Sequence, residues 1–279
     1  MDLQFFVDKE ACIGCGECVK VCPYGVLQLD GEVAAMSHER RELCMHCQHC
    51  LAVCGTGALS ILGKRPADSV ALPNDLPSVD QLANLMMARR SVRRYRKTPL
   101  TREEIDFLLK TAAYAPTGRN NRQVLFTVVE EPEVMETLRW ATYDALMEKI
   151  NNGGLPERFK FLEKIVTDAV LHKRDDIFRG APHLLIASSP ADGVSPDADS
   201  LIALSYFELL AAGMGIGSLW CGLAKWTLTM LTPEILRSMG VPDSHLVGYM
   251  MVFGRPAVTF HRTVQRDDAR INRVGAIRR

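Results

Sequence analysis

Cysteine is the residue type whose placement most clearly indicates chemistry in this sequence. Eight of the nine cysteines lie before residue 55, and only Cys221 lies after it. The eight form two runs with the same spacing, C-x2-C-x2-C-x3-C, and the second run begins 32 positions after the first. Neighbouring residues repeat as well, since Gly25 has a counterpart at Gly57. Residues 1–63 are therefore an internal repeat that can supply two sets of thiolate ligands.

This spacing is typical of ligands to [4Fe-4S] clusters, because three closely spaced thiolates can bind three irons of one cubane. The first run ends in Cys22-Pro23, which completes a bacterial-type signature. In that pattern the fourth cysteine of each run binds the other cluster. The alternative is zinc, which usually takes two separated pairs of ligands and would leave the third close cysteine surplus. The predicted metal ligands are Cys12, Cys15, Cys18 and Cys54 for cluster I, and Cys44, Cys47, Cys50 and Cys22 for cluster II.

The segment resembles a two-cluster bacterial-type ferredoxin over essentially all of its 63 residues. It departs from that pattern at Gly55, where a second proline is expected, and this change leaves the ligands intact. His46 and His49 lie between the cysteines of the second run. We interpret them as surface residues, with tuning of the cluster potential as the alternative.

A run of arginines, Arg89-Arg90-Ser91-Val92-Arg93, forms the second motif that could bind a ligand. Guanidinium groups match phosphate geometry and serine adds a neutral donor, whereas solvated surface arginines are the alternative. Six further arginines near the C-terminus, between residues 262 and 279, could complete the same anion site. The glycines at 213, 215 and 217 do not form a dinucleotide motif, because their spacing is GxGxG and they lead from a helix into a strand.

Five short motifs occur in a fixed order along the rest of the chain. They are Arg89-x-Ser91-x-Arg93-x-Tyr95, Ala115-Pro116-Thr117-Gly118-Arg119-Asn120, Gly215-Ile216-Gly217-Ser218-Leu219-Trp220-Cys221-Gly222, Val241-Pro242 and Gly254-Arg255-Pro256. With this ordered set, residues 80–270 resemble the FMN-dependent nitroreductase family. The resemblance implies an α+β fold and a homodimer with FMN at the subunit interface.

The resemblance also implies which residues contact FMN, and it assigns no catalytic side chain. The sequence departs from the family pattern after Asn120, at Arg122-Gln123-Val124, which leaves the local ring contacts open. We interpret Cys221 as a small buried residue near the flavin rather than a nucleophile, because no histidine is nearby in sequence. The predicted FMN contacts are Arg89, Arg90, Ser91, Arg93, Asn120, Leu219, Trp220, Cys221, Gly222 and Arg266, with Arg262 as a weaker choice for the phosphate.

The two resemblances together predict an FMN-dependent oxidoreductase that receives electrons through two [4Fe-4S] clusters or from NAD(P)H. No separate nicotinamide domain is visible, so NAD(P)H would have to stack on the flavin itself. A low-potential protein is the other expected donor, and a small planar compound such as a nitroaromatic or a quinone is the expected acceptor in a ping-pong reaction. The alternative is a non-enzymatic electron-transfer or redox-sensing module.

Proline and apolar periodicity predict the domain organisation. Residues 64–78 contain three prolines and connect a ferredoxin domain over 1–63 to a nitroreductase-like domain over 79–279. The second domain is predicted to be α+β with a central mixed sheet of four or five strands. A capping box at Thr101 and Glu104 begins one of its helices, which ends before Pro116. The other helices are predicted over 79–90, 132–150, 157–173, 199–212 and 233–239, and the strands over 124–129, 183–188, 217–221 and 246–253.

The composition of the chain excludes several classes of function. The chain has 279 residues, of which 47% are apolar and 24% are charged, as in an ordinary globular protein. With 33 basic and 33 acidic residues, it is not expected to bind nucleic acid. The first residues lack a secretory pattern, so we expect a cytoplasmic protein with reduced thiols. The apolar stretch 201–224 carries one charge, Glu208, and is broken by glycines, so we interpret it as buried rather than membrane-spanning.

Overall fold

The computed structural model describes residues 2–276, which form two compact units. The first unit contains the residues up to Leu76 together with Pro116–Arg122. The second unit contains Pro77–Ala115 and the residues from Gln123 onward. The chain passes from the first unit to the second between Leu76 and Pro77, within the segment 64–78 that the prolines marked as a connector.

The internal repeat of the sequence is also a repeat of structure in the first unit. Helix α1 (Glu17–Lys20) and helix α2 (His49–Ala52) begin and end at matching positions of the two runs. Strand β1 (Phe6–Val7) pairs with β4 (Leu59–Ser60), and β2 (Leu27–Asp30) pairs with β3 (Val33–Met36), both antiparallel. Short 3-10 turns cover Arg41–Leu43 and Pro66–Asp68.

Two positions in each cysteine run have a left-handed backbone. In the first run they are Gly14 and Gly16, with φ of 65° and 71°. In the second run the matching positions are His46 and Gln48, with φ of 56° and 61°. A side chain in this conformation costs roughly 1–2 kcal/mol relative to glycine. Both runs therefore turn in the same way, and the second run keeps this turn despite the strain.

Helices make up most of the second unit, and their starts follow the local sequence. Ser78 and Thr101 each form a capping box, with Gln81 and Glu104 respectively, and so begin the first two helices. The capping box predicted at Thr101 is thereby confirmed. The helices are α3 (Val79–Ala88), α4 (Arg102–Ala112), α5 (Pro132–Asn151), α6 (Phe161–His172), α7 (Pro196–Gly213), α8 (Gly222–Trp226) and α9 (Pro233–Ser238).

Two helical features differ from the sequence prediction. The helix expected over 157–173 begins with a separate 3-10 turn, Glu157–Phe159, before α6. Helix α8 and the π-helical turn that follows it, Thr227–Leu231, were not predicted. The threonines in this stretch favour no helix by propensity, so packing of Leu228 and Leu231 in the hydrophobic core decides its conformation.

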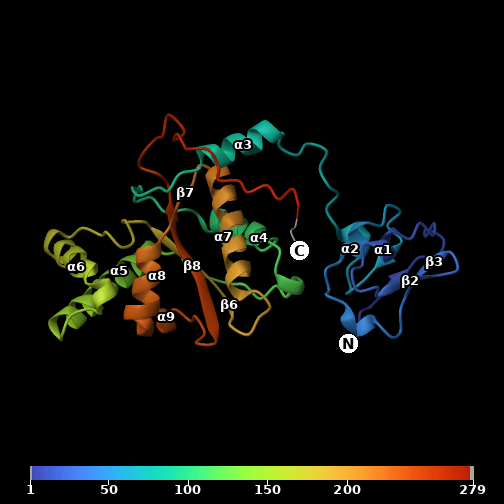
Figure 1. The fold of residues 1–279 in the computed structure, drawn as a ribbon, viewed down its shortest axis with the longest axis horizontal. Helices are drawn as coiled ribbons and strands as arrows, with labels where there is room; N and C mark the ends of the chain where they lie inside the picture. Colours follow the sequence, from blue (N-terminus) through green and yellow to red (C-terminus); the bar gives the residue numbers. More distant parts are fainter. Residues whose placement is uncertain (1, 277–279) are drawn as a thin grey trace. The chain divides into compact units, whose positions relative to one another are not determined.

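A four-stranded sheet lies at the centre of the second unit (Figure 1). It consists of β5 (Leu125–Val129), β6 (His183–Pro190), β7 (Gly217–Trp220) and β8 (His245–Gly254), in the order β5-β6-β8-β7. All three pairings between these strands are antiparallel. Among the described residues, the parallel component of the predicted mixed sheet is limited to one bridge, between Ser91 and Ser218.

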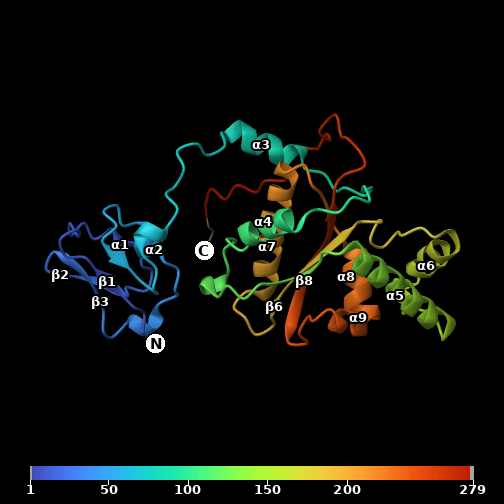
Figure 2. The same cartoon turned by 180° about the vertical axis from the view of Figure 1, so that it is seen from behind.

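Alternate side chains of β6 and β8 divide the hydrophobic core into two layers. On β8, Met250 and Val252 pack with α5, α6 and α8, whereas Met251 and Phe253 pack with α4 and α7. Helices therefore cover both faces of the sheet (Figure 2). Strands buried on both faces read as continuous apolar runs, which explains the sequence pattern of β6 and β8.

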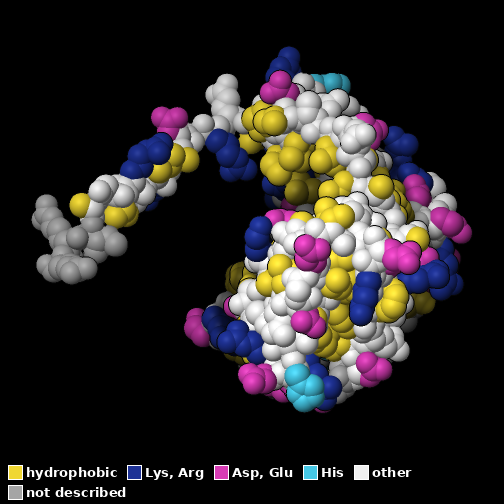
Figure 3. Space-filling view, turned by 90° about the vertical axis from the view of Figure 1, so that its right-hand side faces the viewer, with side chains coloured by type: hydrophobic (Ala, Val, Ile, Leu, Met, Phe, Trp, Pro, Cys, Tyr) yellow, Lys and Arg dark blue, Asp and Glu magenta, His cyan; other side chains and the backbone are white. Residues whose placement is uncertain are grey.

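Apolar side chains also occur on the surface. Val70 and Leu72, in the segment that connects the units, are 94% and 90% exposed. On the face drawn in Figure 3, hydrophobic side chains alternate with acidic and basic ones. Among residues 2–276, no helix is long and apolar enough to cross a membrane. The apolar stretch 201–224 instead forms the end of α7, a turn, β7 and the start of α8.

Candidate functional site

The eight cysteines of the repeat are distributed around two cavities of the first unit. One cavity, of about 330 Å³, is lined by Cys12, Cys15, Cys18 and Cys54. The other, of about 30 Å³, is lined by Cys22, Cys44, Cys47 and Cys50. Each cavity thus takes three thiols from one run and the fourth thiol from the other run. Within residues 2–276, no three Cys, His, Asp or Glu side chains are placed to hold a single metal ion.

Several of these thiols are held in their neutral form. Burial raises the pKa of Cys18 and of Cys44, and it raises the pKa of Cys50 to about 11. Neighbouring thiols act in the same direction, because a second negative charge nearby disfavours ionisation. Binding of iron to these thiols must therefore release protons.

The two cysteine runs differ in how much of their loops is covered. Ile13, which follows the first cysteine of the first run, is 73% exposed. Its counterpart Met45 is half-buried, and its carbonyl oxygen accepts a hydrogen bond of 3.0 Å from Asn120 Nδ2. The Arg119 guanidinium lies 5.7 Å from the centre of the Tyr24 ring. Asn120, predicted to contact the flavin, thus belongs to the first unit and holds the second cysteine loop.

The arginine segment that follows α3 is fixed in place along strand β7. The Val92 amide donates to the Ser218 carbonyl oxygen at 2.9 Å, next to the bridge between Ser91 and Ser218. A Cβ atom at Gly217 would lie 2.7–2.9 Å from three carbon atoms of Val92. Glycine is therefore required where the two segments meet, which explains the end of the GxGxG motif.

Two adjacent arginines in this segment have different partners. Arg89 Nη1 pairs with Glu208 Oε1 of α7 at 3.2 Å, and the two side chains are 27% and 10% exposed. Arg90 Nη1 donates to the Arg89 carbonyl oxygen at 2.7 Å. Nε and Nη2 of Arg90 are buried and have no hydrogen-bond partner within the described part of the chain. Unpaired buried donors on a charged group are costly, so this guanidinium is suited to an anion.

Glu208 was not predicted as part of the site. The signal was present, since Glu208 is the one charged residue in the apolar stretch 201–224. An acid in a buried helix face is rarely found without a partner. Pairing it with Arg89, 119 positions earlier in the chain, could not be read from the sequence.

The residues predicted to line the flavin ring lie at the end of β7 and the start of α8. Leu219 and Cys221 are buried, and Trp220 and Gly222 are partly exposed. The Trp220 and Tyr249 rings are 5.3 Å apart with an edge-to-face arrangement. Cys221 Sγ donates to the Ile177 carbonyl oxygen at 3.0 Å, and burial raises its pKa to about 11. Cys221 is therefore a neutral thiol in the core.

The remaining predicted FMN contacts are exposed arginines. Arg93 is exposed, and its Nη1 lies 3.5 Å from the Ser91 carbonyl oxygen. Arg262 and Arg266 are exposed in a C-terminal segment without helix or strand. The structure forms no hydrogen bond or ion pair between Arg266 and the arginine segment in the described residues. Arg278 and Arg279 lie outside the described residues.

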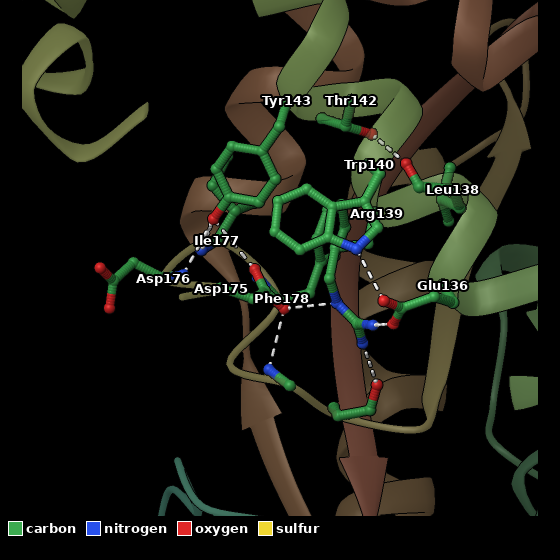
Figure 4. Close-up of polar contacts among 12 residues, drawn as sticks. Glu136, Leu138, Arg139, Trp140, Thr142, Tyr143, Asp175, Asp176, Ile177 and Phe178 are labelled. Carbon is green, nitrogen blue, oxygen red and sulfur yellow. Dashed lines mark hydrogen bonds and ion pairs between the residues drawn. The ribbon is translucent and has the colours of Figure 1, made fainter. Parts of the chain in front are cut away.

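A separate polar network connects α5 with the loop before β6 (Figure 4). Asp175 accepts hydrogen bonds from Arg139 Nε at 2.7 Å, from the Tyr143 hydroxyl at 3.0 Å and from the amides of Phe178 and Gly180. Arg139 also pairs with Glu136 and donates to the Ala181 carbonyl oxygen. These groups satisfy one another, so we interpret the network as structural.

Comparison with known proteins establishes the family. The model of the nitroreductase family matches residues 86–255, which is more than half of the chain. This chain belongs to the nitroreductase family. The model of the 4Fe-4S dicluster domain matches residues 11–59, so a 4Fe-4S ferredoxin domain precedes the nitroreductase domain. The predicted fusion of these two domains is confirmed.

Curated proteins and solved structures are similar to part of this chain. An NADH dehydrogenase of Thermus thermophilus is 25% identical over 180 residues, which are 61% of this chain and 84% of that protein. An iodotyrosine deiodinase of Haliscomenobacter hydrossis is 27% identical over 144 residues, 52% of this chain and 62% of that protein. A Bacteroides fragilis nitroreductase, solved with bound FMN, aligns with a TM-score of 0.55 and 25% identity, covering 69% of this chain and 99% of that chain.

Proposed function

We propose that this nitroreductase-family protein is an FMN-dependent oxidoreductase that receives electrons through two [4Fe-4S] clusters or from NAD(P)H. Its acceptor is a small planar compound such as a nitroaromatic or a quinone, and turnover is ping-pong. The observation that carries the proposal is the buried guanidinium of Arg90, whose Nε and Nη2 have no hydrogen-bond partner among residues 2–276. Arg90 lies in the segment that the Val92 amide joins to Ser218 of β7. Ser218 directly precedes the residues predicted to line the ring.

The residues around Arg90 fit a phosphorylated flavin. Arg90 would bind the phosphate through its two unpaired donors, with Arg89 and Ser91 beside it and Arg93 at the exposed edge. Leu219, Trp220, Cys221 and Gly222 would line the ring. FMN supplies the transfer of a hydride or of single electrons, and the protein supplies orientation and electrostatics. Asn120 and Arg266 stay predicted contacts that rest on the sequence resemblance alone.

The number and grouping of the thiols support two clusters. Each set supplies four thiols around one cavity, which is the number of ligands that a [4Fe-4S] cluster takes. The clusters supply one-electron transfer. The acidic residues of 1–63 outnumber the basic ones by eight to four, so the region that would meet an electron donor carries negative charge. We further propose a homodimer with FMN at its interface and a cytoplasmic location.

An anaerobic stopped-flow experiment tests the proposal. The protein loaded with iron, sulfide and FMN is mixed with NADH, NADPH or a reduced ferredoxin while flavin and cluster absorbance are followed together. We expect both chromophores to bleach and to recover when a nitroaromatic or quinone is added. Multiple turnovers support an enzyme, whereas a single reduction without turnover would indicate an electron-transfer or sensing module and would contradict the proposal.

A variant separates the role of the clusters from that of the flavin. Substitution of Cys15 and Cys47 by Ala removes one ligand from each thiol set. We expect turnover with reduced ferredoxin to be lost and turnover with NAD(P)H to persist. If ferredoxin-driven turnover were unchanged in a variant that lacks clusters by iron analysis, the proposed electron route would be wrong.

A further inference from the structure

We infer that Glu208 is a positioning residue for the FMN phosphate site and that it acts by holding Arg89. The inference rests on the proposed function, because it assumes that Arg89 and Arg90 bind FMN. Glu208 lies on the buried side of α7, and it is 8% exposed. A buried carboxylate persists only when a partner compensates its charge, and here that partner comes from the arginine segment.

One oxygen of Glu208 contacts both segments of the proposed site. Oε1 accepts from Arg89 Nη1 at 3.2 Å and from the Ser218 hydroxyl at 3.4 Å. Ser218 is also the residue whose carbonyl oxygen binds the Val92 amide. The arginine segment and strand β7 are therefore connected through backbone and through Glu208 at the same point. Leu219, the first of the predicted ring contacts, follows directly.

The two consecutive arginines of this segment differ in their partners. Of two consecutive guanidiniums, Arg89 is paired with Glu208, whereas Arg90 keeps two buried donors that no other described residue partners. The pairing occupies Nη1 of Arg89, and no described residue bonds to its other side-chain donors, which a ligand could therefore use. Glu208 thus fixes the direction of one guanidinium and leaves the charge of the other for the phosphate, which carries a charge of about −2 at neutral pH.

The substitution Glu208→Gln tests this role, because it keeps the shape of the side chain and removes the charge. We expect FMN to dissociate about tenfold more readily, a change of about 1.4 kcal/mol in binding free energy. The measurement is a flavin fluorescence titration of cluster-loaded protein from which FMN has been removed. Circular dichroism of the same samples checks that the fold is intact.

A double-mutant cycle distinguishes positioning of Arg89 from a general structural effect. In the background of Arg89→Met, Glu208→Gln is expected to have little further effect on FMN affinity, because the side chain that Glu208 holds is gone. An equal loss in both backgrounds would show that Glu208 does not act through Arg89, and the inference would be wrong. Glu104→Gln is the matched control, since Glu104 pairs with Arg255 at 2.8 Å and keeps its capping box as glutamine.

The outcomes separate the inference from the proposed function. If the wild-type protein bound no FMN, the proposed function would fail and the inference with it. If the wild-type bound FMN and Glu208→Gln bound it equally well, the inference alone would fail. Ser218→Ala removes only the second contact of the carboxylate and provides a test if Glu208→Gln does not fold. We expect it to weaken FMN binding about threefold, roughly the contribution of one hydrogen bond, and unchanged affinity would contradict the inference.

Discussion

His183 is an ionisable residue that the second unit buries completely at the start of β6. Its Nε2 accepts a hydrogen bond of 2.9 Å from the Leu100 amide, which requires the neutral ring. Burial lowers the pKa of His183 below its ordinary value of 6.5. The unfolded chain therefore binds a proton at a higher pH than the folded chain does.

We expect this histidine to make the second unit less stable in mild acid. Its contribution is fully present above about pH 6.5 and is lost as the pH falls toward the folded pKa, with a slope of at most about 1.4 kcal/mol per pH unit. The free energy of unfolding in urea, measured between pH 7.5 and pH 5, should fall less steeply in His183→Gln than in the wild type. His172→Gln, at an exposed position, serves as the control. Parallel curves for wild type and His183→Gln would refute this account.

Site residues could be predicted from the sequence where a single residue type supplies all the ligands. The cysteine spacing led to two sets of four thiols, and the structure groups the same thiols around two cavities. Asn120 could not be placed in this way, because its contact with Met45 joins positions 75 apart in the chain. The unequal partners of Arg89 and Arg90 were also beyond the sequence, since two identical neighbours differ only in what lies opposite them.

Helix α5 is joined to the loop before β6 by the network centred on Asp175 (Figure 4). We expect Asp175→Ala to lower the free energy of unfolding by about 3–5 kcal/mol, because it leaves the buried guanidinium of Arg139 without its buried acidic partner. Urea denaturation followed by tryptophan fluorescence measures the change. Asp168→Asn, which breaks an exposed pair with Lys164, should change stability by less than about 1 kcal/mol. Equal effects of the two substitutions would mean that the network is not structural.

The junction between strand β7 and the arginine segment leaves no room for a side chain at position 217. Gly217→Ala places a methyl group against Val92, so we expect a loss of stability of about 1–3 kcal/mol. FMN affinity should fall as well, because Val92 lies between Ser91 and Arg93 of the proposed phosphate segment. Gly275→Ala is the control, since a Cβ there meets no atom of residues 2–276 within 4 Å. Wild-type stability and FMN affinity in the Gly217→Ala variant would show that the segment can move away without effect.

Helices with their own start signals were predicted well, as α4 and its capping box illustrate. The strands β6 and β8 were also recognisable, because both are nearly continuous apolar runs. Helix α8 and its π-helical continuation were missed, since Gly222 and the threonines that follow give no helical signal. The strand order β5-β6-β8-β7 was not predictable either, because β7 pairs with a strand that comes later in the chain rather than with its predecessor.

The two units of the molecule differ in what stabilises them. The core of the first unit is small, and it consists of Leu3, Cys18, Leu27, Ala34, Leu51, Leu59 and Ile61. The second unit has two cores, one on each face of its sheet. A domain of this size buries little apolar area and is only marginally stable by itself, so we expect metal binding to contribute to its folding.

Removal of iron should therefore unfold the first unit and spare the second. After treatment with an iron chelator and an oxidant, we expect rapid hydrogen exchange throughout β1–β4 and unchanged protection in β6 and β8. Mass spectrometry of peptides from both units measures this directly. The variant in which Cys15 and Cys47 are replaced by Ala should show the same pattern without any treatment. Protection that persisted in β1–β4 after complete loss of iron would show that the small core is sufficient.

The arginine segment also covers part of the outer side of β7. Strand β7 is an edge strand of the sheet, and the Val92 amide donates a hydrogen bond to the Ser218 carbonyl oxygen on its outer side. An uncovered edge strand offers its free amides and carbonyls to any other extended chain. A protein whose arginine segment has come loose would thus expose a template for intermolecular pairing. Because FMN would bind Arg89 and Arg90 of this segment, we expect its loss to loosen the segment and to cause turbidity and particle growth. The bound flavin would then also keep the protein in solution.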